Sequence, residues 1–290
     1  MSVHVRNLSH VYSPGMPGEQ KALDDVSFDI YDGETAAVIG HTGSGKSTLL
    51  QHLNGLLKPT SGAITVDGTD ITDPTTVMRD VRRRVGLVFQ YPEYQLFEET
   101  VALDVAYGPR NLGLDKADTD ERVRSAIDLV GLNYEEIADR SPFELSGGQK
   151  RRVAIAGIIA MRPRVLILDE PTAGLDPGAH GDILSMIRKI HESEGNIIIF
   201  VSHNMADVAS MADRVIVMDQ GRLIMQGAPD EVFANKTALN EIGLDVPPVT
   251  DLMHTIKNRG ADVNAAILDI RAAEDEIFRF LSSRAREVIE

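Results

Sequence analysis

One glycine-rich segment restricts the fold of this 290-residue chain more than any other part of the sequence. Residues 40–47 match the pattern G-x-x-x-x-G-K-[S/T]. The short apolar run Thr35–Ile39 precedes them, and Ser47–Leu57 has the spacing of a helix. A strand that turns through glycines into a helix presents backbone N–H groups and the positive end of the helix dipole to an anion. The segment therefore predicts a phosphate-binding loop.

The residue types in this loop suit a nucleoside triphosphate. Its glycines let consecutive N–H groups turn toward the β- and γ-phosphates, and Lys46 adds a positive charge. The Ser47 hydroxyl is expected to ligate Mg²⁺. The residues expected to bind ATP in and beside the loop are Gly40, His41, Thr42, Gly43, Ser44, Gly45, Lys46, Ser47 and Thr48.

A second apolar segment, Val165–Leu168, ends in two adjacent carboxylates. Asp169 at the end of a strand can hold Mg²⁺ through its oxygens. Adjacent strand residues point to opposite sides unless the chain turns, so Glu170 can face the γ-phosphate as the general base for an attacking water. Acidic residues end many strands, so it is the combination with the phosphate loop that indicates a nucleotide site.

Strand-like and helix-like segments alternate along much of the chain. Residues 23–30 alternate with period two, except at the Asp24-Asp25 pair, which predicts an antiparallel strand exposed on one face. The later alternation predicts an α/β fold whose sheet is mostly parallel and covered by helices on both faces. The strand candidates are Thr35–Ile39, Val85–Phe89, Val165–Leu168, Ile197–Val201 and Val215–Met218; the helix candidates include Ser47–Leu57, Gln149–Met161, Gly178–Glu192 and Met205–Met211.

Two regions depart from this alternation. Residues from about 95 to 160 are largely helical in pattern, with breaks expected at Pro109 and Gly113, and are expected to form an inserted helical subdomain. After residue 229 the strand pattern stops, and Val263–Leu281 has the pattern of one helix. We therefore expect a nucleotide-binding domain over residues 1–229 and a small helical extension over residues 230–290.

Composition excludes several classes of protein. Lysine and arginine number 29 against 44 aspartate and glutamate, and the net charge of −15 argues against a partner made of nucleic acid. The absence of cysteine excludes disulfides, cysteine-ligated zinc and a thiol nucleophile. No apolar run approaches the roughly 18 to 20 residues that a bilayer requires. If the protein works at a membrane, other chains are expected to supply the spanning helices.

The segment Leu-Ser-Gly-Gly-Gln precedes the helix candidate that begins at Gln149, and it offers a second helix N-terminus to an anion. In chain order, the phosphate loop, Gln90, this segment, Asp169-Glu170, the run Ala173–Asp176 and His203 resemble the nucleotide-binding subunit of an ABC transporter. The resemblance covers residues 3–228 and implies the P-loop NTPase fold of the ABC ATPases, with ATP and Mg²⁺ bound. The signature residues are Leu145, Ser146, Gly147, Gly148 and Gln149.

The resemblance also implies a head-to-tail dimer, in which the signature of one subunit closes over ATP on the phosphate loop of the other. Ser146, Gly148 and Gln149 would reach the partner's ATP, and Asp176 in the D-loop would cross the interface.

Three further roles are implied by the resemblance. Gln90 would sense Mg²⁺, for which it is a candidate ligand with Ser47 and Asp169, or the attacking water. His203 would contact the γ-phosphate and orient the catalytic Glu170. Tyr12 would stack on adenine, although a surface or core tyrosine is an open alternative.

Residues 89–101 are rich in aromatic and acidic side chains and resemble the energy-coupling-factor and cobalt-type importer ATPases. In those proteins the segment lies under the membrane subunit, although an ordinary core loop stays open for this chain. On this interpretation apolar side chains pack on the helices of the membrane subunit and carboxylates meet its arginines. The first group is Tyr91, Tyr94, Leu96 and Phe97, and the second is Glu93, Glu98 and Glu99.

The C-terminal segment places apolar residues at alternating spacings of four and three, the stripe of a helix that packs on another. Dimerisation with a partner helix and packing against the chain's own body both stay open. The stripe consists of Ala266, Ile270, Ala273, Ile277 and Phe280.

Taken together, the resemblance implies an ATPase subunit of an energy-coupling-factor importer for a vitamin or other micronutrient, peripheral at the cytoplasmic face of the cell membrane. Its implied partners are a second ABC ATPase, a transmembrane coupling component and a substrate-binding membrane component. Two alternatives stay open. One is a cobalt or nickel importer ATPase acting as a homodimer. The other is a soluble ABC ATPase of DNA repair or the ribosome, which is disfavoured because Leu145 follows Ser47 too closely for a long coiled-coil insertion and only one cassette is present.

Overall fold

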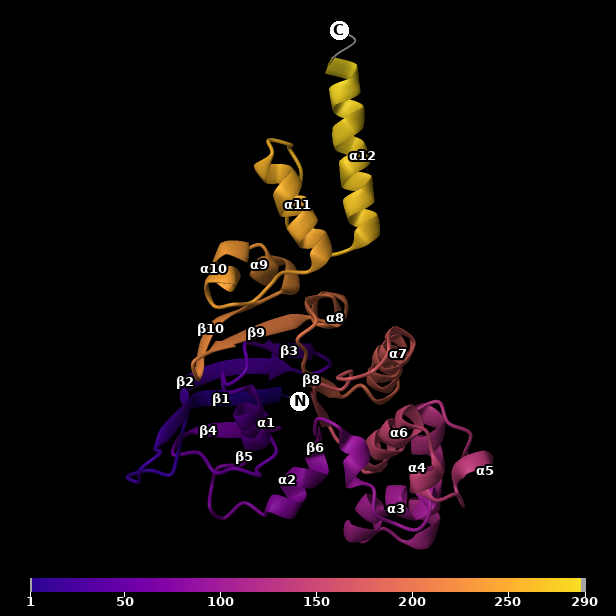
Figure 1. The fold of residues 1–290 in the computed structure, drawn as a ribbon. Helices are drawn as coiled ribbons and strands as arrows, with labels where there is room; N and C mark the ends of the chain where they lie inside the picture. Colours follow the sequence, from indigo (N-terminus) through magenta and orange to yellow (C-terminus); the bar gives the residue numbers. More distant parts are fainter. Residues whose placement is uncertain (1, 288–290) are drawn as a thin grey trace.

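The computed structural model of the protein describes residues 2–287, and their side chains as far as Ser283. Its strands form two sheets (Figure 1). The strands are β1 Ser2–Tyr12, β2 Gln20–Tyr31, β3 Thr35–Ile39, β4 Ser61–Val66, β5 Thr69–Asp70, β6 Val85–Val88, β7 Val165–Asp169, β8 Ile197–Val201, β9 Arg214–Asp219 and β10 Arg222–Gly227.

The first sheet is antiparallel, with the strand order β2-β1-β4-β5. The second has the order β10-β9-β3-β8-β7-β6, and every neighbouring pair in it is parallel except β10 with β9. The expected break in the alternation of β2 is a local irregularity, since Asp25 has a φ of 57°. The predicted α/β class with an N-terminal antiparallel part and a mixed sheet is confirmed.

Helices cover the second sheet and extend beyond it (Figure 1). The α-helices are α1 Lys46–Leu53, α2 Met78–Arg84, α3 Val101–Asn111, α4 Lys116–Leu129, α5 Tyr134–Ile137, α6 Gly147–Ile159, α7 Pro177–Glu194, α8 Met205–Met211, α9 Pro229–Phe233, α10 Lys236–Glu241, α11 Pro248–Asn258 and α12 Ile270–Glu287. No helix within residues 2–287 is both long and apolar enough to cross a membrane.

The central strand β3 explains why the sequence folds in layers. All five of its residues are buried. Ala36 and Val38 join the core between the antiparallel sheet and α1, whereas Ala37 and Ile39 join the core under the other helices. A strand buried on both faces needs a continuous apolar run rather than an alternating one. The phosphate loop therefore follows a strand that is packed against a core on each face.

The helices α3, α4 and α6 lie together beside the edge of the sheet at β6 (Figure 1). The expectation that Pro109 breaks a helix is wrong, because Pro109 lies inside α3. It stands in the last turn, and the helix ends two residues later, before Gly113 at a φ of 81°. Near the end of a helix a proline leaves little of the hydrogen-bond ladder to disrupt.

The residues after β10 pack in two different ways. Phe233 and Leu239 are fully buried in the main core. The hairpin α11–α12 instead has its own small core around Met253 and projects from the rest of the chain (Figure 1). The expectation of one helix from Val263 is wrong, since α12 begins at Ile270. The Asp269 carboxylate accepts hydrogen bonds from the backbone at the start of α12, as residues that precede a helix do.

Candidate functional site

The phosphate loop joins β3 to α1 in a conformation that requires its glycines. A Cβ at Gly40 would lie 2.3 Å from the Met218 backbone oxygen on β9, so only glycine fits there. Gly43 and Gly45 have φ values of 82° and 100°, which other residues rarely adopt. Helix α1 begins without a side-chain cap and without an acidic residue in its first turn. Its first N–H groups are therefore available to an anion.

Lys46 lies inside the loop rather than in solvent. Its side chain is buried, and Nζ donates hydrogen bonds to the backbone oxygens of Gly40 at 2.7 Å and His41 at 2.8 Å. Burial lowers the pKa of Lys46, and the nearby charges of Glu170 and Asp169 act against that shift. The ammonium thus holds the loop in shape at the place where phosphates are expected.

Asp169 ends strand β7 next to the loop, and the nearby Ser47 side chain favours the charged form of its carboxylate. Burial raises the pKa of Asp169, and the charge of Glu170 adds to the rise. No cluster of three or more His, Cys, Asp or Glu that could hold a metal exists within residues 2–287. Mg²⁺ is usually held by one or two carboxylates together with substrate phosphates, so a hydroxyl beside one carboxylate fits it.

Two predicted residues, Gln90 and His203, contact the carboxylate of Glu170. Gln90 Nε2 donates to Glu170 Oε2 at 2.8 Å, and His203 Nε2 lies 2.8 Å from Glu170 Oε1. Glu170 itself has a φ of 49°, a left-handed conformation that a non-glycine residue adopts at an energetic cost. The chain therefore turns at Glu170, and both carboxylate oxygens are contacted by residues that follow other strands.

Tyr12, the residue proposed to stack on adenine, lies beside the helix that follows the loop. Its hydroxyl is 3.2 Å from Thr48 Oγ1 on α1, and its ring packs edge-on against His10 with centroids 4.5 Å apart. The side chain keeps 38% of its surface exposed. One part of the ring is thus held while another stays open to solvent.

The signature segment starts α6, which Figure 1 shows among the helices beside the sheet, apart from α1. Ser146 Oγ accepts from the Gln149 backbone N–H, and Gln149 Oε1 accepts from the Ser146 N–H, which closes a capping box. A Cβ at Gly147 or Gly148 would meet nothing within 4 Å. Their own chain does not require these glycines for packing, so their open faces suit a group from outside. Asp176 caps α7 by accepting from the N–H groups of residues 178 and 179.

One residue of this region that the motifs do not identify is Arg151 on α6, the middle of the basic run 150–152. The Arg151 side chain is 3% exposed and forms a two-point ion pair with Glu93. It also donates to the backbone oxygens of Pro171 and Ala173. Its spacing indicates burial, since Arg151 precedes Ile155 by one helical turn and both lie on the buried face of α6. Arg151 thus ties the start of α6 to the segments that follow Gln90 and Glu170.

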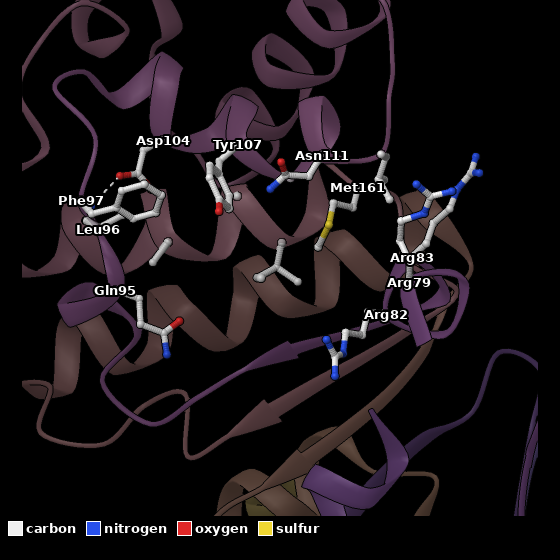
Figure 2. A pocket seen from close by; sticks show the side chains of 15 residues that line it. Arg79, Arg82, Arg83, Gln95, Leu96, Phe97, Asp104, Tyr107, Asn111 and Met161 are labelled. Carbon is white, nitrogen blue, oxygen red and sulfur yellow. Dashed lines mark hydrogen bonds between the residues drawn. The ribbon is translucent and has the colours of Figure 1, made fainter. Parts of the chain in front are cut away.

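The segment after Gln90 borders a cavity of about 570 Å³ (Figure 2). Figure 2 shows Arg79, Arg82 and Arg83 at one end of it and Gln95 and Phe97 at the other. Apolar residues of α3 and α6 contribute much of the remaining wall. The lining residues are Arg79, Arg82, Arg83, Gln95, Leu96, Phe97, Asp104, Tyr107, Gly108, Asn111, Leu112, Ala154, Gly157, Ile158 and Met161.

Two expectations for this segment are wrong. Leu96 is buried, because it packs into the main core beneath the segment. Glu93 is not available to an arginine of a membrane subunit, because it already forms an ion pair with Arg151 of its own chain. Tyr94 and Phe97 are exposed at 85% and 57% as expected, and Tyr91 is exposed at 40%. Glu98 is half-buried and Glu99 is exposed.

The sequence is similar to known transport ATPases. The ABC transporter family model matches residues 23–173. The energy-coupling factor transporter ATP-binding protein EcfA2 of Clostridium acetobutylicum is 55% identical over 286 residues, which cover 99% of this chain and 100% of that protein. The protein of the same name from Clostridioides difficile is 53% identical over 285 residues, covering 98% and 99%.

Solved structures agree with the sequence comparison. CbiO1 of Clostridium perfringens, described as part of the ABC transporter complex cbiONQ, superposes with a TM-score of 0.73 at 40% identity and covers 87% of this chain and 98% of its own. The ATP-binding cassette MJ0796, solved as a dimer bound to ADP and Pi, gives a TM-score of 0.69 at 27% identity and covers 78% and 98%.

Proposed function

Because the chain belongs to the ABC transporter family and, within it, to the energy-coupling factor transporter ATP-binding proteins, we propose that it hydrolyses ATP to power import of a vitamin or other micronutrient through separate membrane subunits. One arrangement carries the proposal. Glu170 is held between Gln90 and His203, next to Asp169 and the phosphate loop.

In this proposal the chain's own residues divide the hydrolysis among them. The loop and Lys46 bind the β- and γ-phosphates, and Glu170 accepts the proton of the attacking water. Gln90 and His203 fix the Glu170 carboxylate so that one orientation is presented to that water. Bound Mg²⁺, held by Ser47 and Asp169 with Gln90 nearby, would neutralise charge on the phosphate oxygens.

The site is completed by a second ABC ATPase, identical or homologous. Ser146, Gly148 and Gln149 lie at the start of a helix, and the glycines there leave space for a phosphate to approach its N–H groups. In a head-to-tail pair these groups reach the ATP of the other subunit. Asp176, which starts α7, lies at the same interface.

The cavity beside residues 95–97 is the proposed docking groove for a transmembrane coupling component. Phe97 packs edge-on against Tyr107 at 4.9 Å, and together they give the groove an exposed aromatic edge. An apolar face of a helix from the membrane component fits such a groove. The groove follows Gln90 in the chain, so docking and the Glu170 site share one segment. The protein would then lie peripherally at the cytoplasmic face of the cell membrane, with a substrate-binding membrane component in the same complex.

The division into a nucleotide-binding domain over residues 1–229, with a helical subdomain near 95–160, and a C-terminal extension over residues 230–290 is part of the proposal. The hairpin α11–α12 carries an apolar groove of about 530 Å³ whose rim includes Leu252, Ile277, Phe278 and Leu281. Leu252, Phe278 and Leu281 are each more than half exposed. We assign this groove to dimerisation with the second ATPase.

A second candidate function is a cobalt or nickel importer in which the chain pairs with itself. The structural likeness to CbiO1 at 40% identity favours this candidate over a soluble, non-transport ATPase.

Purification from detergent-solubilised membranes tests the proposal. A tagged chain is expected to recover a polytopic membrane protein, identified by mass spectrometry, together with a second ATPase if the pair is mixed. Phe97→Asp should release the membrane protein. The matched control Ile224→Asp, which changes an exposed apolar side chain on β10, should retain it. Recovery of the chain only with ribosomes or nucleic acid, or equal recovery in both variants, would contradict the proposed docking.

A further inference from the structure

His41, the second residue of the phosphate loop, has both ring nitrogens directed at oxygen atoms. Nδ1 lies 2.7 Å from the backbone oxygen of Thr42, and Nε2 lies 2.6 Å from Oδ1 of Asp219 at the end of β9. A carbonyl oxygen only accepts, and so does an ionised carboxylate. A neutral imidazole has a single N–H, so it can satisfy only one of these two acceptors. The doubly protonated ring donates to both.

The surrounding packing keeps the ring in this position. Gly40 lies against the Met218 backbone oxygen, which brings the next loop residue beside Asp219. Ser44 O accepts a hydrogen bond from the Gly221 N–H, so the loop is fixed to the β9–β10 turn at a second point. The Asp219 side chain is 16% exposed, whereas His41 is 41% exposed. The ring is therefore anchored at its inner side and open on its outer side.

The charged groups near the loop include Asp169 and Glu170 at the end of β7, whose charges act on Lys46. On α1, Lys46 Nζ donates to the His41 backbone oxygen. Lys21 on β2 and Arg222 on β10 both bind Asp24, and Asp29 on β2 pairs with His4 and Arg6 on β1. Asp219 is thus the carboxylate that contacts His41. An imidazolium here adds a second cation, besides Lys46, to a loop within a chain of net charge −15.

We propose that His41 is a positioning residue of the phosphate loop that acts as an imidazolium held between the Thr42 carbonyl and Asp219, and that loss of its proton weakens binding of the nucleoside triphosphate. This rests on the proposed ATP-binding function. Because the charged ring donates to both acceptors and a neutral ring to only one, affinity is expected to fall when the ring loses its proton. The charged ring both fixes the loop and attracts the phosphates.

ATP dissociation constants of the full chain, measured from pH 6 to 9 for wild type and His41→Asn, test this directly. ATP itself titrates in this range, and the ratio of the two constants removes that contribution. The variant should bind about three- to tenfold more weakly at pH 6.5 and about equally at pH 8.5. The matched control His180→Asn, which removes a ring that lies 2.9 Å from the Asp207 carboxylate, should leave the wild-type profile unchanged.

Spectra of the full chain labelled with ¹⁵N-histidine give the second readout, with the His41 signals identified by their loss in His41→Asn. Both ring nitrogens of His41 should be protonated at pH 6.5, and Asp219→Asn should shift the ring to a neutral tautomer. A constant affinity ratio across pH, or a neutral His41 at pH 6.5 in the wild type, would overturn the proposal. Absence of ATP binding by the wild type at every pH would instead contradict the proposed function itself.

Discussion

Two helices of this protein start with a glycine-rich turn, and they are prepared for an anion in opposite ways. Helix α1 has no side-chain cap, and Lys46 and the Glu170 site lie next to its first turn. Helix α6 closes its first turn with the reciprocal Ser146 and Gln149 hydrogen bonds. The first has most groups of the proposed phosphate site on one chain. The second is a stable surface that offers N–H groups to something outside it.

The difference indicates why such a protein works as a pair. A helix N-terminus without a cap is costly unless an anion fills it, so α1 gains from binding nucleotide. At the α6 start the capping box already pairs the N–H groups of Ser146 and Gln149, so this helix gains less from an anion by itself. ATP binding at the start of α1 should therefore need only one chain. The start of α6 should affect ATP only when two chains meet.

Lys46→Ala gives the largest expected effect, because it removes the charge from the phosphate loop. ATP affinity should fall about 100-fold and hydrolysis with it. The comparison is sharpened by Lys150→Ala, which removes the lysine in the first turn of α6. That control should change the ATP affinity of the isolated chain less than about twofold. Equal losses in the two variants, measured by calorimetry, would show that the two helix starts do not differ in this way.

Gly148→Asp should separate binding from turnover. A Cβ at residue 148 would meet nothing on its own chain within 4 Å, so the chain should tolerate the substitution, whereas the new carboxylate would repel a phosphate. Turnover in the assembled ATPase should fall about 100-fold, with the ATP affinity of the isolated chain unchanged. Gly181→Asp on α7 is the matched control, since a Cβ there also meets open space. A loss of single-chain affinity in Gly148→Asp would break the comparison.

Glu93→Ala should destabilise the chain by about 3 kcal/mol, because it leaves the buried Arg151 without its carboxylate. Burial alone would raise the pKa of Glu93, but the hydrogen bonds and charge of Arg151 outweigh it and hold the pKa below its ordinary value of 4.5. A depressed pKa stabilises the fold above pH 4.5, and that contribution disappears as pH falls through the lower folded value.

Denaturant unfolding at several pH values measures this effect. The difference in unfolding free energy between wild type and Glu93→Ala should therefore be full at neutral pH and narrow below about pH 4.5. Glu99→Ala, an exposed change in the same segment, should cost less than about 0.5 kcal/mol. If both variants are equally stable, Arg151 does not need Glu93 and the position of α6 depends on other contacts.

Asp169→Asn should have the smallest effect on the stability of the fold, and it should stabilise the chain where Glu93→Ala destabilises it. Burial, and then the charge of Glu170, raise the pKa of Asp169 above its ordinary value of 3.8. The ionised carboxylate therefore destabilises the fold when the pH is above 3.8. The variant should melt at a slightly higher temperature at neutral pH without nucleotide, and the gain should vanish below pH 3.8. MgATP should then stabilise the wild type more than the variant. Glu192→Gln, exposed on α7, should show neither change.

The sequence predicted the parts of this protein that depend on neighbouring residues. The phosphate loop follows a local strand ending, so motif and context were sufficient to predict where it lies. The meeting of Gln90, Glu170 and His203 was expected only through resemblance to a family. Their catalytic and binding roles stay predictions.

What the sequence did not reveal depends on contacts between distant segments. Arg151 binds Glu93, which lies 58 residues earlier, and no local pattern distinguishes it from an exposed arginine. Leu96 is buried because the core beneath it accepts a leucine, although its neighbours on either side are exposed. Apolar spacing does not determine where α12 begins. Its start is set by Asp269, whose carboxylate caps the first turn.

The measurement that tests the account most directly compares Glu170→Gln with wild type in the ATPase purified with its membrane partners. The substitution keeps the shape of the side chain and the phosphate contacts but removes the base. We expect that ATP affinity is unchanged and that hydrolysis at this chain's site falls at least about 100-fold, because Glu170 is the proposed general base. Near-normal hydrolysis in Glu170→Gln, with ATP bound as in wild type, would contradict it.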